Sequence, residues 1–439
     1  MSLGSQNIQT DYGIFAKIGG NTFYQSEFVS LLFHISLNAP PNGELRLLDR
    51  SGKGITGSES GSLMVFEFNN TSDDKTQKQS SMTCIIDSIT EFVSNAENTG
   101  YIIKFTAGNS SVLNKISAAY TGNSAGVMTQ VYNKFKASTL NSLGLVPLDS
   151  SIQLSDTMTW RLIAEDMWEQ LTSVVNRSYI PNDYMYWTWD DVNNNLVISS
   201  LGISKSQPDK YIFIQDDSAI GSTTESKVIA TNPSYTKWKF SDITRSADVG
   251  SKRSMLYPNA VISSIDSTNL VTGNLSNGCF AQTVASTGNT SGTTLQQKTN
   301  LGTNVAYGKL DIHRHNKSNM HNMYTSAEQM RNYVYSTYSK IVRVLIHNNS
   351  GPPIGSRVIV LCIPNNYRTG GSVNLDAHYS DSYIVTEKNI TFDAIETGHN
   401  GRPSPTTGRQ RTLITLASDN FAGDGTDAIK KAATTLKLV

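Results

Sequence analysis

Residues 381–395 read DSYIVTEKNITFDAI, and residues 81–95, far away in the chain, read SMTCIIDSITEFVSN. In both stretches apolar and polar residues alternate, which predicts long β-strands with one buried face. Each stretch is followed by a second alternating run, YIIKFTAG at 101–108 and RTLITLASDN at 411–420. The sequence therefore predicts two similar long strand pairs, one near each end of the chain.

Two further strands precede each long pair. ELRLLD at 44–49 and SLMVFEF at 62–68 come before the first pair, and KIVRVLIHNN and GSRVIVLCIPNN come before the second. In each block a glycine-containing turn joins these strands, and a polar excursion follows them. Residue identity between the blocks is slight, so the match is one of pattern. It predicts two similar antiparallel β-barrels with an insert between them.

The segment between the blocks has helical periodicity instead. In SAGVMTQVYNKFKAS, residues 124–138, apolar residues recur at steps of four, and Ser124 is placed to cap the helix. SDTMTWRLIAEDMWEQLTSVVNRS, residues 155–178, predicts a longer helix capped by Ser155 or Asp156. Its apolar stripe is Trp160, Ile163, Met167, Leu171 and Val174, and its acids Glu165, Asp166 and Glu169 are expected on a solvated face.

Residues 184–200, YMYWTWDDVNNNLVISS, have the pattern of a hairpin with an Asn-rich turn. Asp190 and Asp191, beside tryptophans, also raise the hypothesis of a catalytic pair at a sugar-binding surface. Neighbouring residues on a strand point to opposite faces, so both carboxyls reach one atom only if the turn bends them together. The hairpin is the favoured interpretation. A glycan-binding module is an alternative, although most aromatic residues occupy strand or helix positions that face a core.

The second half of the chain contains further elements. Residues 206–240 return to strand character, with KYIFIQ and YTKWKF among their runs, and residues 270–305 form a long polar loop. TSAEQMRNYVYSTYSK, residues 325–340, predicts a third helix in which Thr325 and Glu328 have capping-box spacing. The tail DAIKKAATTLKLV predicts a short amphipathic helix.

Two motifs could carry chemistry. GNSAG around Ser124 matches the G-x-S-x-G motif of serine hydrolases, and a helix follows it as that motif requires. The chain lacks the alternating strand–helix pattern of that fold, and a plain helix cap explains the same residues. His313, His315 and His321 could be metal ligands, but only Asp311 stands at ligand spacing with them. A polar strand leading into a loop is the favoured interpretation, so we expect no catalytic, cofactor or metal site.

Charge and cysteine content exclude several classes of protein. Charged residues make up 16% of the chain, and 36 basic residues balance 36 acidic ones, which predicts no attraction to nucleic acid or to anionic membranes. Cys84, Cys279 and Cys362 have no CxxC spacing, which favours buried free thiols over a disulfide framework or a zinc site. Neither a signal peptide nor a run of 18 apolar residues is present, so we expect a soluble protein made in the cytoplasm, without a membrane span.

The order of these elements resembles the baseplate hub proteins of contractile-tailed bacteriophages, whose relatives include the hub portion of type VI secretion spikes. The resemblance covers most of the chain as a pattern. It is sharpest over residues 157–197, where the hairpin carries a W-D-D-x-N turn at 189–193. It is also sharp in the C-terminal block, where MRNYVYSTYSKIVRVLI leads into P-x-x-GSRVIVLCIPN and DSYIVTEKNITF. Asn389 stands where the family usually has a histidine.

The resemblance implies a structural protein of the virion rather than an enzyme. Three copies would form a ring at the distal end of the tail tube, in which the two barrels of each chain mimic two subunits of the hexameric tube. Such a ring would join the sixfold tube to the threefold spike. Implied partners are the spike, the tube or its distal initiator, the tape measure protein and baseplate wedge proteins. DNA would pass through the lumen without specific binding, and a serine hydrolase or a glycan-binding tail protein is the alternative.

The expected fold class is mainly β with α, and the chain divides into five segments. These are a first tube-like β-barrel at 1–108, a helix-rich insert with the aromatic hairpin at 109–205, strands and a polar loop at 206–305 that belong partly to the insert, a second tube-like β-barrel at 306–418, and a tail at 419–439. The long pairs at 81–108 and 381–418 are expected to face the lumen, with a neutral or mildly acidic surface.

Overall fold

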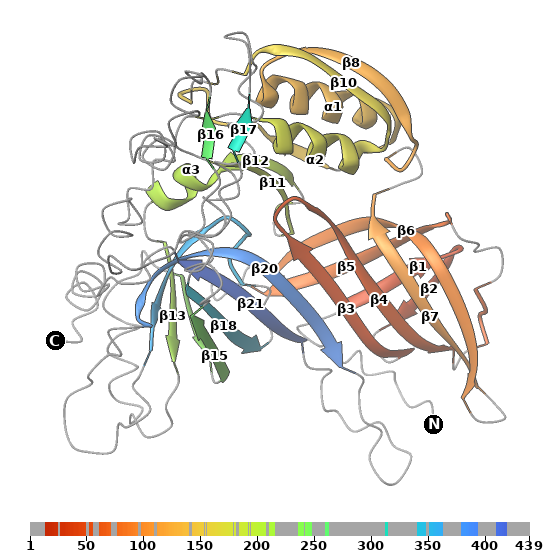
Figure 1. The fold of residues 1–439 in the computed structure, drawn as a ribbon. Helices are drawn as coiled ribbons and strands as arrows, with labels where there is room; N and C mark the ends of the chain where they lie inside the picture. The colour runs from red at the N-terminus through yellow and green to blue at the C-terminus, as the bar shows by residue number, and fades with distance from the viewer. Residues whose placement is uncertain are drawn as a thin grey trace, which may run out of the picture.

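The chain is mainly β-sheet, with three helices among the residues that the structure describes (Figure 1). The structure, a computed structural model, describes residues 14–215 apart from short gaps, then 236–240, 242–247, 260–262, 312–314, 340–347, 351–362, 379–393 and 410–418. The predicted helices at 325–340 and in the tail, and the polar loop at 270–305, lie outside these residues.

The strands of the N-terminal block are β1 (Ile14–Ile18), β2 (Asn21–Tyr24), β3 (Phe28–Ser36), β4 (Ala39–Asp49), β5 (Leu63–Thr71), β6 (Gln77–Ser94) and β7 (Asn98–Ala107). The middle of the chain forms β8 (Ile116–Gly122), α1 (Ser124–Thr139), β9 (Gly144–Val146), β10 (Met158–Glu165), α2 (Met167–Arg177), β11 (Met185–Asp190), β12 (Asn195–Ser200) and α3 (Leu201–Ser206). The remaining strands are β13 (Tyr211–Gln215), β14 (Thr236–Phe240), β15 (Asp242–Ala247), β16 (Ala260–Ile262), β17 (Ile312–Arg314), β18 (Lys340–His347), β19 (Arg357–Leu361), β20 (Asp381–Asp393) and β21 (Gln410–Ser418).

One 14-stranded sheet contains two sets of seven strands with the same order. The first set runs β2-β1-β5-β6-β7-β4-β3, and the second runs β14-β13-β19-β20-β21-β18-β15. Each strand of the first set has its counterpart at the same place in the chain order of the second. The repeat predicted from the pattern of alternation is therefore present in the strand pairing. Among the described strands the pairing does not close into a ring, because β2, β14 and β15 each pair on one side only.

The second set departs from the expected antiparallel pattern at one strand. β13 runs parallel to both β14 and β19, whereas its counterpart β1 runs antiparallel to both of its neighbours. β13 comes from residues expected to belong partly to the insert, yet it pairs with β19 of the C-terminal block. β13 follows helix α3 in the chain. It therefore runs in the opposite direction to β1, relative to its neighbours in the sheet.

The two sets also share a local structure on their longest strands: a glycine turn hydrogen-bonded to the strand, followed by a β-bulge. In the first set, Gly61 N–H donates to the Ile86 carbonyl at 2.7 Å and Ile86 N–H to the Ser62 carbonyl at 3.0 Å. Directly after Ile86 the register between β6 and β7 shifts at Asp87, which is a β-bulge. Gly61 has a φ of 91°, a conformation that favours glycine.

The second set repeats this arrangement. Gly355 N–H donates to the Val385 carbonyl at 2.8 Å, and Val385 N–H donates to the Ser356 carbonyl at 3.0 Å. The register between β20 and β21 then shifts after Val385, at Thr386. Gly355 has a φ of 82°. The bulges therefore mark equivalent positions, with Ile86 of β6 corresponding to Val385 of β20.

β20 joins the two sets into one sheet. Residues 381–384 of β20 pair with β19, and residues 387–393 pair with β3 of the first set. β21 lies along the other side of β20, so β19 and β3 share one side of the same strand. Figure 1 shows β20 and β3 side by side between the two sets.

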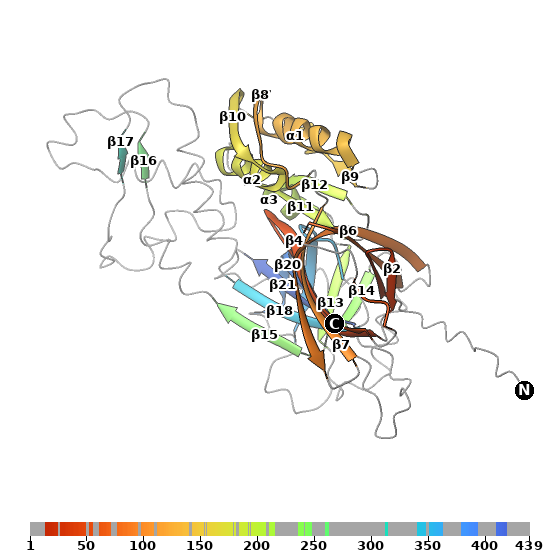
Figure 2. The ribbon, with the colours of Figure 1, turned by 90° about the vertical axis from the view of Figure 1, so that its right-hand side faces the viewer.

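The middle of the chain lies above this sheet in Figures 1 and 2, with α1 and α2 beside the β8–β10 pair. The predicted hairpin is confirmed: β11 and β12 pair antiparallel, and β12 also pairs parallel with β9. Helix α1 is confirmed as well. Asn123 rather than Ser124 caps it, because the Asn123 Oδ1 accepts a hydrogen bond from Gly126 N–H at 2.8 Å.

The helix predicted over 155–178 is wrong in its first half. Residues 158–165 form the strand β10, in which buried Trp160 and Leu162 alternate with exposed neighbours such as Ile163, 72% exposed. Helix α2 begins only after Asp166, whose side chain forms a capping box with Glu169. Apolar residues in this stretch recur both at every second position and at every third or fourth position, so the pattern fits a strand and a helix. Pairing with β8 makes residues 158–165 a strand.

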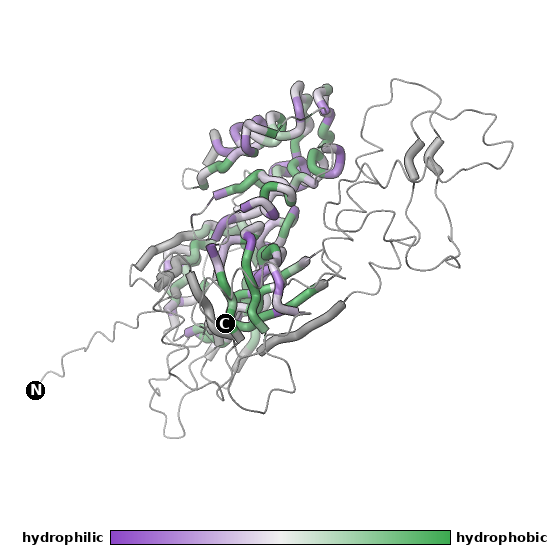
Figure 3. Tube along the Cα trace, turned by 90° about the vertical axis from the view of Figure 1, so that its left-hand side faces the viewer, coloured by the Kyte–Doolittle hydropathy of each residue, from purple (hydrophilic) through white to green (hydrophobic). Residues whose placement is uncertain are grey.

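Hydrophobic residues gather along the strands of the sheet (Figure 3). One core cluster extends from the first set through the middle of the chain to the second set. The largest fully buried side chains are Trp160, Trp187, Tyr132, Tyr186, Tyr383, Phe23, Phe33, Phe66, Phe105 and Phe213.

Candidate functional site

The junction between the aromatic hairpin and both strand sets brings distant parts of the chain together through backbone and side-chain hydrogen bonds. It begins at Asn38, in the turn between β3 and β4, which adopts a φ of 55°. Asn38 N–H donates to the Trp187 carbonyl, and Trp187 N–H donates to the Asn38 Oδ1, both at 2.9 Å. The Asn38 Nδ2 donates to the Tyr184 hydroxyl at 2.5 Å. One asparagine therefore holds the turn of the first set against the strand β11.

Two stacked tryptophans support this contact. The rings of Trp168 on α2 and Trp187 on β11 lie 5.1 Å apart with an interplanar angle of 16°. The Trp168 Nε1 donates to the Ala107 carbonyl of β7 at 3.1 Å, which ties α2 to the first set. Both rings are buried, and Trp160 and Trp189 are buried as well. None of these four rings is available to stack on a sugar.

The predicted acid pair is divided between two tasks. Asp190 closes the hairpin turn, since its carboxylate accepts hydrogen bonds from the backbone and side chain of Asn193 at 3.2 and 2.7 Å. The Asp191 Oδ1 lies 2.7 Å from the Lys388 Nζ of β20. Burial raises the pKa of Asp191 above its usual value, and the Lys388 ammonium opposes this shift. The interpretation as a hairpin is confirmed, and the two carboxyls have different partners.

The ion pair between Asp191 and Lys388 is nearly out of contact with water. The Lys388 side chain is 0% exposed and that of Asp191 is 10% exposed. Removing one partner of such a pair leaves an uncompensated buried charge, which is costly. The pair therefore fixes the hairpin on β20, at the start of the segment that pairs with β3.

The second set contacts the hairpin at a glycine. A Cβ atom on Gly355 would lie 2.0 Å from the Tyr186 hydroxyl, so only glycine allows this approach. The same hydroxyl bonds to the Ser204 hydroxyl of α3 at 2.8 Å. Arg357 continues the contact, because its guanidinium donates to the Lys205 carbonyl at 3.0 Å. The hairpin and α3 therefore rest on the β19–β20 end of the second set.

The face of the sheet opposite the core is a second candidate surface. Its residues form rows that cross both sets, because the registers of the six central strands are continuous. One row consists of Arg411, Thr391, Leu32, Glu44, Lys104 and Ser88. Beside it, the Asn389 Oδ1 and His34 Nδ1 lie 2.8 Å apart, and Asn389 Nδ2 donates to Glu387 at 3.0 Å.

Charge on this face is sparse and mixed. The charged side chains on this face include the basic Lys17, Arg46, Lys104, Arg343 and Arg411 and the acidic Glu44, Asp87 and Glu387. Arg46 is paired with Glu44 at 2.7 Å. The expectation of a neutral or mildly acidic lumen stays a prediction, because the net charge of the chain does not say which face receives which sign.

Ser124 does not have the surroundings of a nucleophile. Its hydroxyl is buried and makes no hydrogen bond among the described residues, while its backbone N–H donates to Asp156 at 3.1 Å. A strand and a helix flank it, as in a nucleophile elbow, but the strand β8 pairs only with β10. Within the described part of the chain, the buried Ser124 hydroxyl therefore has neither a hydrogen-bonded base nor access to a substrate.

The other candidate residues fall partly outside the described structure. His315 and His321 lie outside it, and the side chain of His313 on β17 is not described. Within the described residues no three His, Cys, Asp or Glu side chains are arranged to hold a metal ion. Cys84 and Cys362 are buried free thiols, as predicted, while Cys279 lies outside the described residues; burial raises the pKa of Cys84 well above its usual value. None of the described helices is long and apolar enough to cross a membrane.

An open groove of about 680 Å³ lies between α2 and the bulge in the middle of β6. Asp87, Glu165, Asp166 and Glu169 line it together with Lys115. Most of these groups have structural partners: Asp166 and Glu169 form the capping box of α2, and Lys115 pairs with Glu169 at 3.1 Å. The groove follows from packing α2 beside a bulge.

Comparison with solved structures identifies the fold as that of phage tail proteins. The 43 kDa tail protein of prophage MuSo2 from Shewanella oneidensis is similar over 93% of this chain and 99% of its own, with a TM-score of 0.51 and 10% identity. This likeness confirms, at the level of the fold, the resemblance that the sequence predicts.

Two further solved structures are similar at lower scores. A tail protein from Neisseria meningitidis matches 94% of this chain and 99% of its own, with a TM-score of 0.49 and 10% identity. A type VI secretion system component from E. coli matches 91% of this chain and 76% of its own, with a TM-score of 0.43 and 8% identity. No protein-family model matches the chain, and no curated protein matches it in sequence.

Proposed function

We propose that this protein is the structural baseplate hub of a phage tail. Three copies form a ring at the end of a contractile tail, which joins the hexameric tail tube to the trimeric spike. The fold of a phage tail protein supports a structural role in the virion tail rather than an enzymatic one. The chain then acts by geometry alone, and it needs no catalytic residue, metal or cofactor.

The observation that carries this proposal is the repeat of seven strands. Two sets with one order lie in the same sheet and join along β3 and β20. A chain with two equivalent sets occupies two positions of a ring, so three chains supply the six positions that meet a sixfold tube. Each set is then one tube-like domain, which neighbouring copies complete into a closed wall.

The sheet face that crosses both sets is the surface we assign to the bore. It carries Thr391, Leu32 and Asn389 between its few charges. DNA affinity grows with the number of phosphates that Lys and Arg neutralise, so this face permits passage with little binding. The middle of the chain, with α1 and α2, then lies at one end of the ring, where it can contact a neighbouring ring.

The partners follow from this position. The tail spike lies on one side of the ring, and the tube or its distal initiator lies on the other. The tape measure protein and the baseplate wedges are further neighbours. The protein assembles in the host cytoplasm and ends in the tail baseplate of the virion.

The test is the mass of the purified protein by light scattering, with and without the spike, followed by negative-stain imaging. We expect a trimer and a ring with threefold symmetry, alone or on addition of the spike. A single monomeric species that stays monomeric with the spike present contradicts the proposal. The spike without the hub is the control for its own trimeric mass.

A further inference from the structure

The long strand β6 is paired on one side only along its second half. β5 pairs with residues 77–85 of β6, and β7 pairs with residues 84–94 on the other side. Beyond the bulge at Asp87, no described strand lies along the side that β5 leaves. Backbone donors and acceptors of residues 88–94 are therefore placed to pair with another strand.

The equivalent segment of the second set has such a partner. After the bulge at Thr386, residues 387–393 of β20 pair antiparallel with β3. β3 lies at the end of the first set, and its counterpart at the end of the second set is β15. β15 pairs with β18 only, so its other side has no described strand. Among the described strands there is thus one such strand pairing, β20 with β3, and two equivalent strand edges, on β6 and β15, that have no partner.

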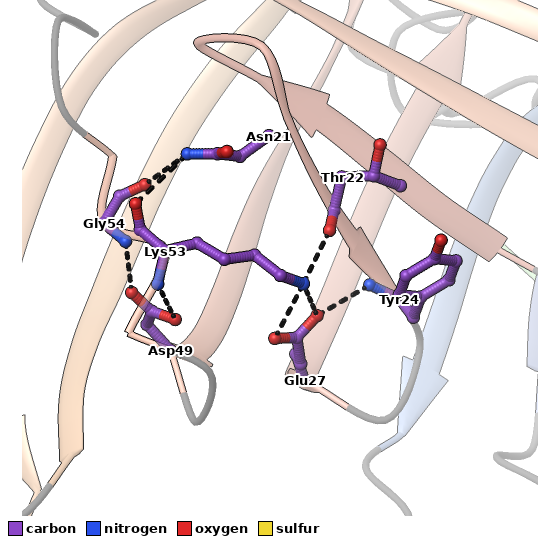
Figure 4. A network of polar contacts seen from close by, with 7 residues as sticks. All are labelled: Asn21, Thr22, Tyr24, Glu27, Asp49, Lys53 and Gly54. Atoms are coloured by element: carbon purple, nitrogen blue, oxygen red, sulfur yellow. Dashed lines mark hydrogen bonds and ion pairs between the residues drawn. The ribbon is translucent and has the colours of Figure 1, made fainter.

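The strand β2 is the edge of the first set opposite β3, and side chains hydrogen-bond to its free backbone groups. Backbone groups of β2 have side-chain partners: Lys53 Nζ donates to the Thr22 carbonyl at 2.8 Å, and Tyr24 N–H donates to the Glu27 Oε2 at 3.0 Å (Figure 4). Lys53 and Glu27 also pair with each other at 3.1 Å, and Asp49 accepts from Gly54 N–H at 2.6 Å. This network occupies two of the backbone groups of β2 that an added strand would need, whereas no described side chain makes such a contact with residues 88–94 of β6.

We propose that residues 88–94 of β6 pair antiparallel with β15 of a second copy of this chain. The pairing repeats, between copies, the contact that β20 and β3 make within one chain. It rests on the proposed function for the number of copies, because a head-to-tail contact of this kind closes into a ring only at the right rotation. The partner is the chain itself, recognised by backbone hydrogen bonds.

The repeat also fixes the register of this contact. Two rows of paired residues start directly before the bulges. The first row is Ile86, Phe105, Gly43 and Phe33, and the second row is Val385, Leu416, Val342 and Arg245. Arg245 of β15 therefore occupies the register position that Phe33 occupies in β3.

In this register an acidic residue and a basic residue occupy paired positions. Phe33 pairs with Ile390, and the counterpart of Ile390 in β6, counted from the bulge, is Glu91. Glu91 of one copy is therefore opposite Arg245 of the next. Glu91 is exposed in the single chain. Cross-strand pairs of opposite charge stabilise a sheet, and like charges in that place destabilise it.

The first experiment exchanges these charges. Glu91→Arg and Arg245→Glu are expected each to raise the concentration at which the ring dissociates by about fivefold per contact, and the double variant to restore it. Ring mass against concentration is read by analytical ultracentrifugation. Lys104→Glu, a charge reversal on the central strand β7, is the matched control and leaves the ring unchanged. Single variants that assemble like the wild type overturn the register.

The second experiment reads the pairing directly. Thr90 faces Ser246 in this register, so the double variant Thr90→Cys with Ser246→Cys forms an intermolecular disulfide on oxidation, because directly paired residues have Cβ atoms close enough for the bond. Thr90→Cys with Thr244→Cys, two residues out of register, is the control and forms little. Equal cross-linking in both variants, or none in either, rejects the proposed contact.

The two proposals fail in different ways. A wild-type protein that stays monomeric with its spike contradicts the hub, while the cysteine pair still reports whether β6 and β15 meet at high concentration. A wild-type ring that ignores both charge reversals keeps the hub and removes this interface.

Discussion

The two sets of strands have one architecture but different surroundings. In the second set, the hairpin covers the turn at Gly355, and β20 continues onto another set. In the first set, the equivalent Gly61 has nothing within 4 Å of the place of a Cβ atom, and the second half of β6 has a described strand, β7, on one side only. The glycine turn and the bulge are common to both sets. The side chains around them differ because the two sets contact different parts of the molecule.

Some features recur in both sets because the fold of each set needs them. Others occur in one set only, because that set contacts the hairpin. The glycine turn and the bulge recur although few residues are identical, because they shape the sheet. Lys388 does not recur: counted from the bulges, its counterpart on β6 is Ile89. That lysine meets Asp191 of the hairpin, which only the second set contacts in this way.

The largest effect is expected from making the second set resemble the first. Lys388→Ile leaves Asp191 buried without its partner, which should lower the free energy of unfolding by about 3–5 kcal/mol. Adding Asp191→Ala removes the stranded charge, and most of this loss should be recovered. Denaturant unfolding followed by tryptophan fluorescence measures both, with Lys104→Ala as an exposed control. A single variant as stable as the wild type would show that the ion pair does not hold the hairpin.

A smaller difference is expected between the two glycine turns. Gly61→Ala places a side chain at positive φ, which costs about 1–2 kcal/mol. Gly355→Ala has the same strain and also a collision with Tyr186, so its loss should be larger by about 1–3 kcal/mol. Thermal and denaturant unfolding of the matched pair measures the difference. Tyr186→Phe should recover part of it only in the Gly355 variant, and equal losses would mean that the hairpin yields without cost.

The smallest effect is expected at the bulges. Thr386 is buried and its hydroxyl donates to the Thr415 carbonyl at 3.1 Å, so Thr386→Val should cost about 1 kcal/mol. Asp87 is exposed and accepts from the Thr106 hydroxyl at 2.7 Å, so Asp87→Ala should change stability by less than about 0.5 kcal/mol. The reverse order in unfolding midpoints would indicate that the exposed bulge is the more constrained one.

Much of the strand structure could be predicted, because alternation with a period of two is a local property. The long pairs and the hairpin follow from it. Local patterns failed where two periods overlap, as around Trp160 and Ile163, where pairing with β8 decides. They also failed at the cap of α1, since Asn123 and Ser124 are both good capping residues in adjacent positions.

The junction could not be predicted, because its partners are distant in the chain. Lys388 and Asp191 are 197 residues apart, and Asn38 and Trp187 are 149 apart. One local signal was available: Lys388 stands at an inward position of an alternating strand, where a lysine needs a buried partner. The distribution of charge over the sheet face was hidden for the same reason, since it depends on which strands become neighbours.

The contact between β3 and β20 also sets an order of events during synthesis. His34 and Asn389, which meet across it, are 355 residues apart. At ribosomal rates, β3 waits roughly 20–70 s for its neighbour to be made. The first seven strands emerge early enough to pair among themselves, but β3 keeps one unsatisfied edge until the last part of the chain appears. A chain whose synthesis stops before β20 therefore keeps an open strand edge, which is a template for pairing with other chains.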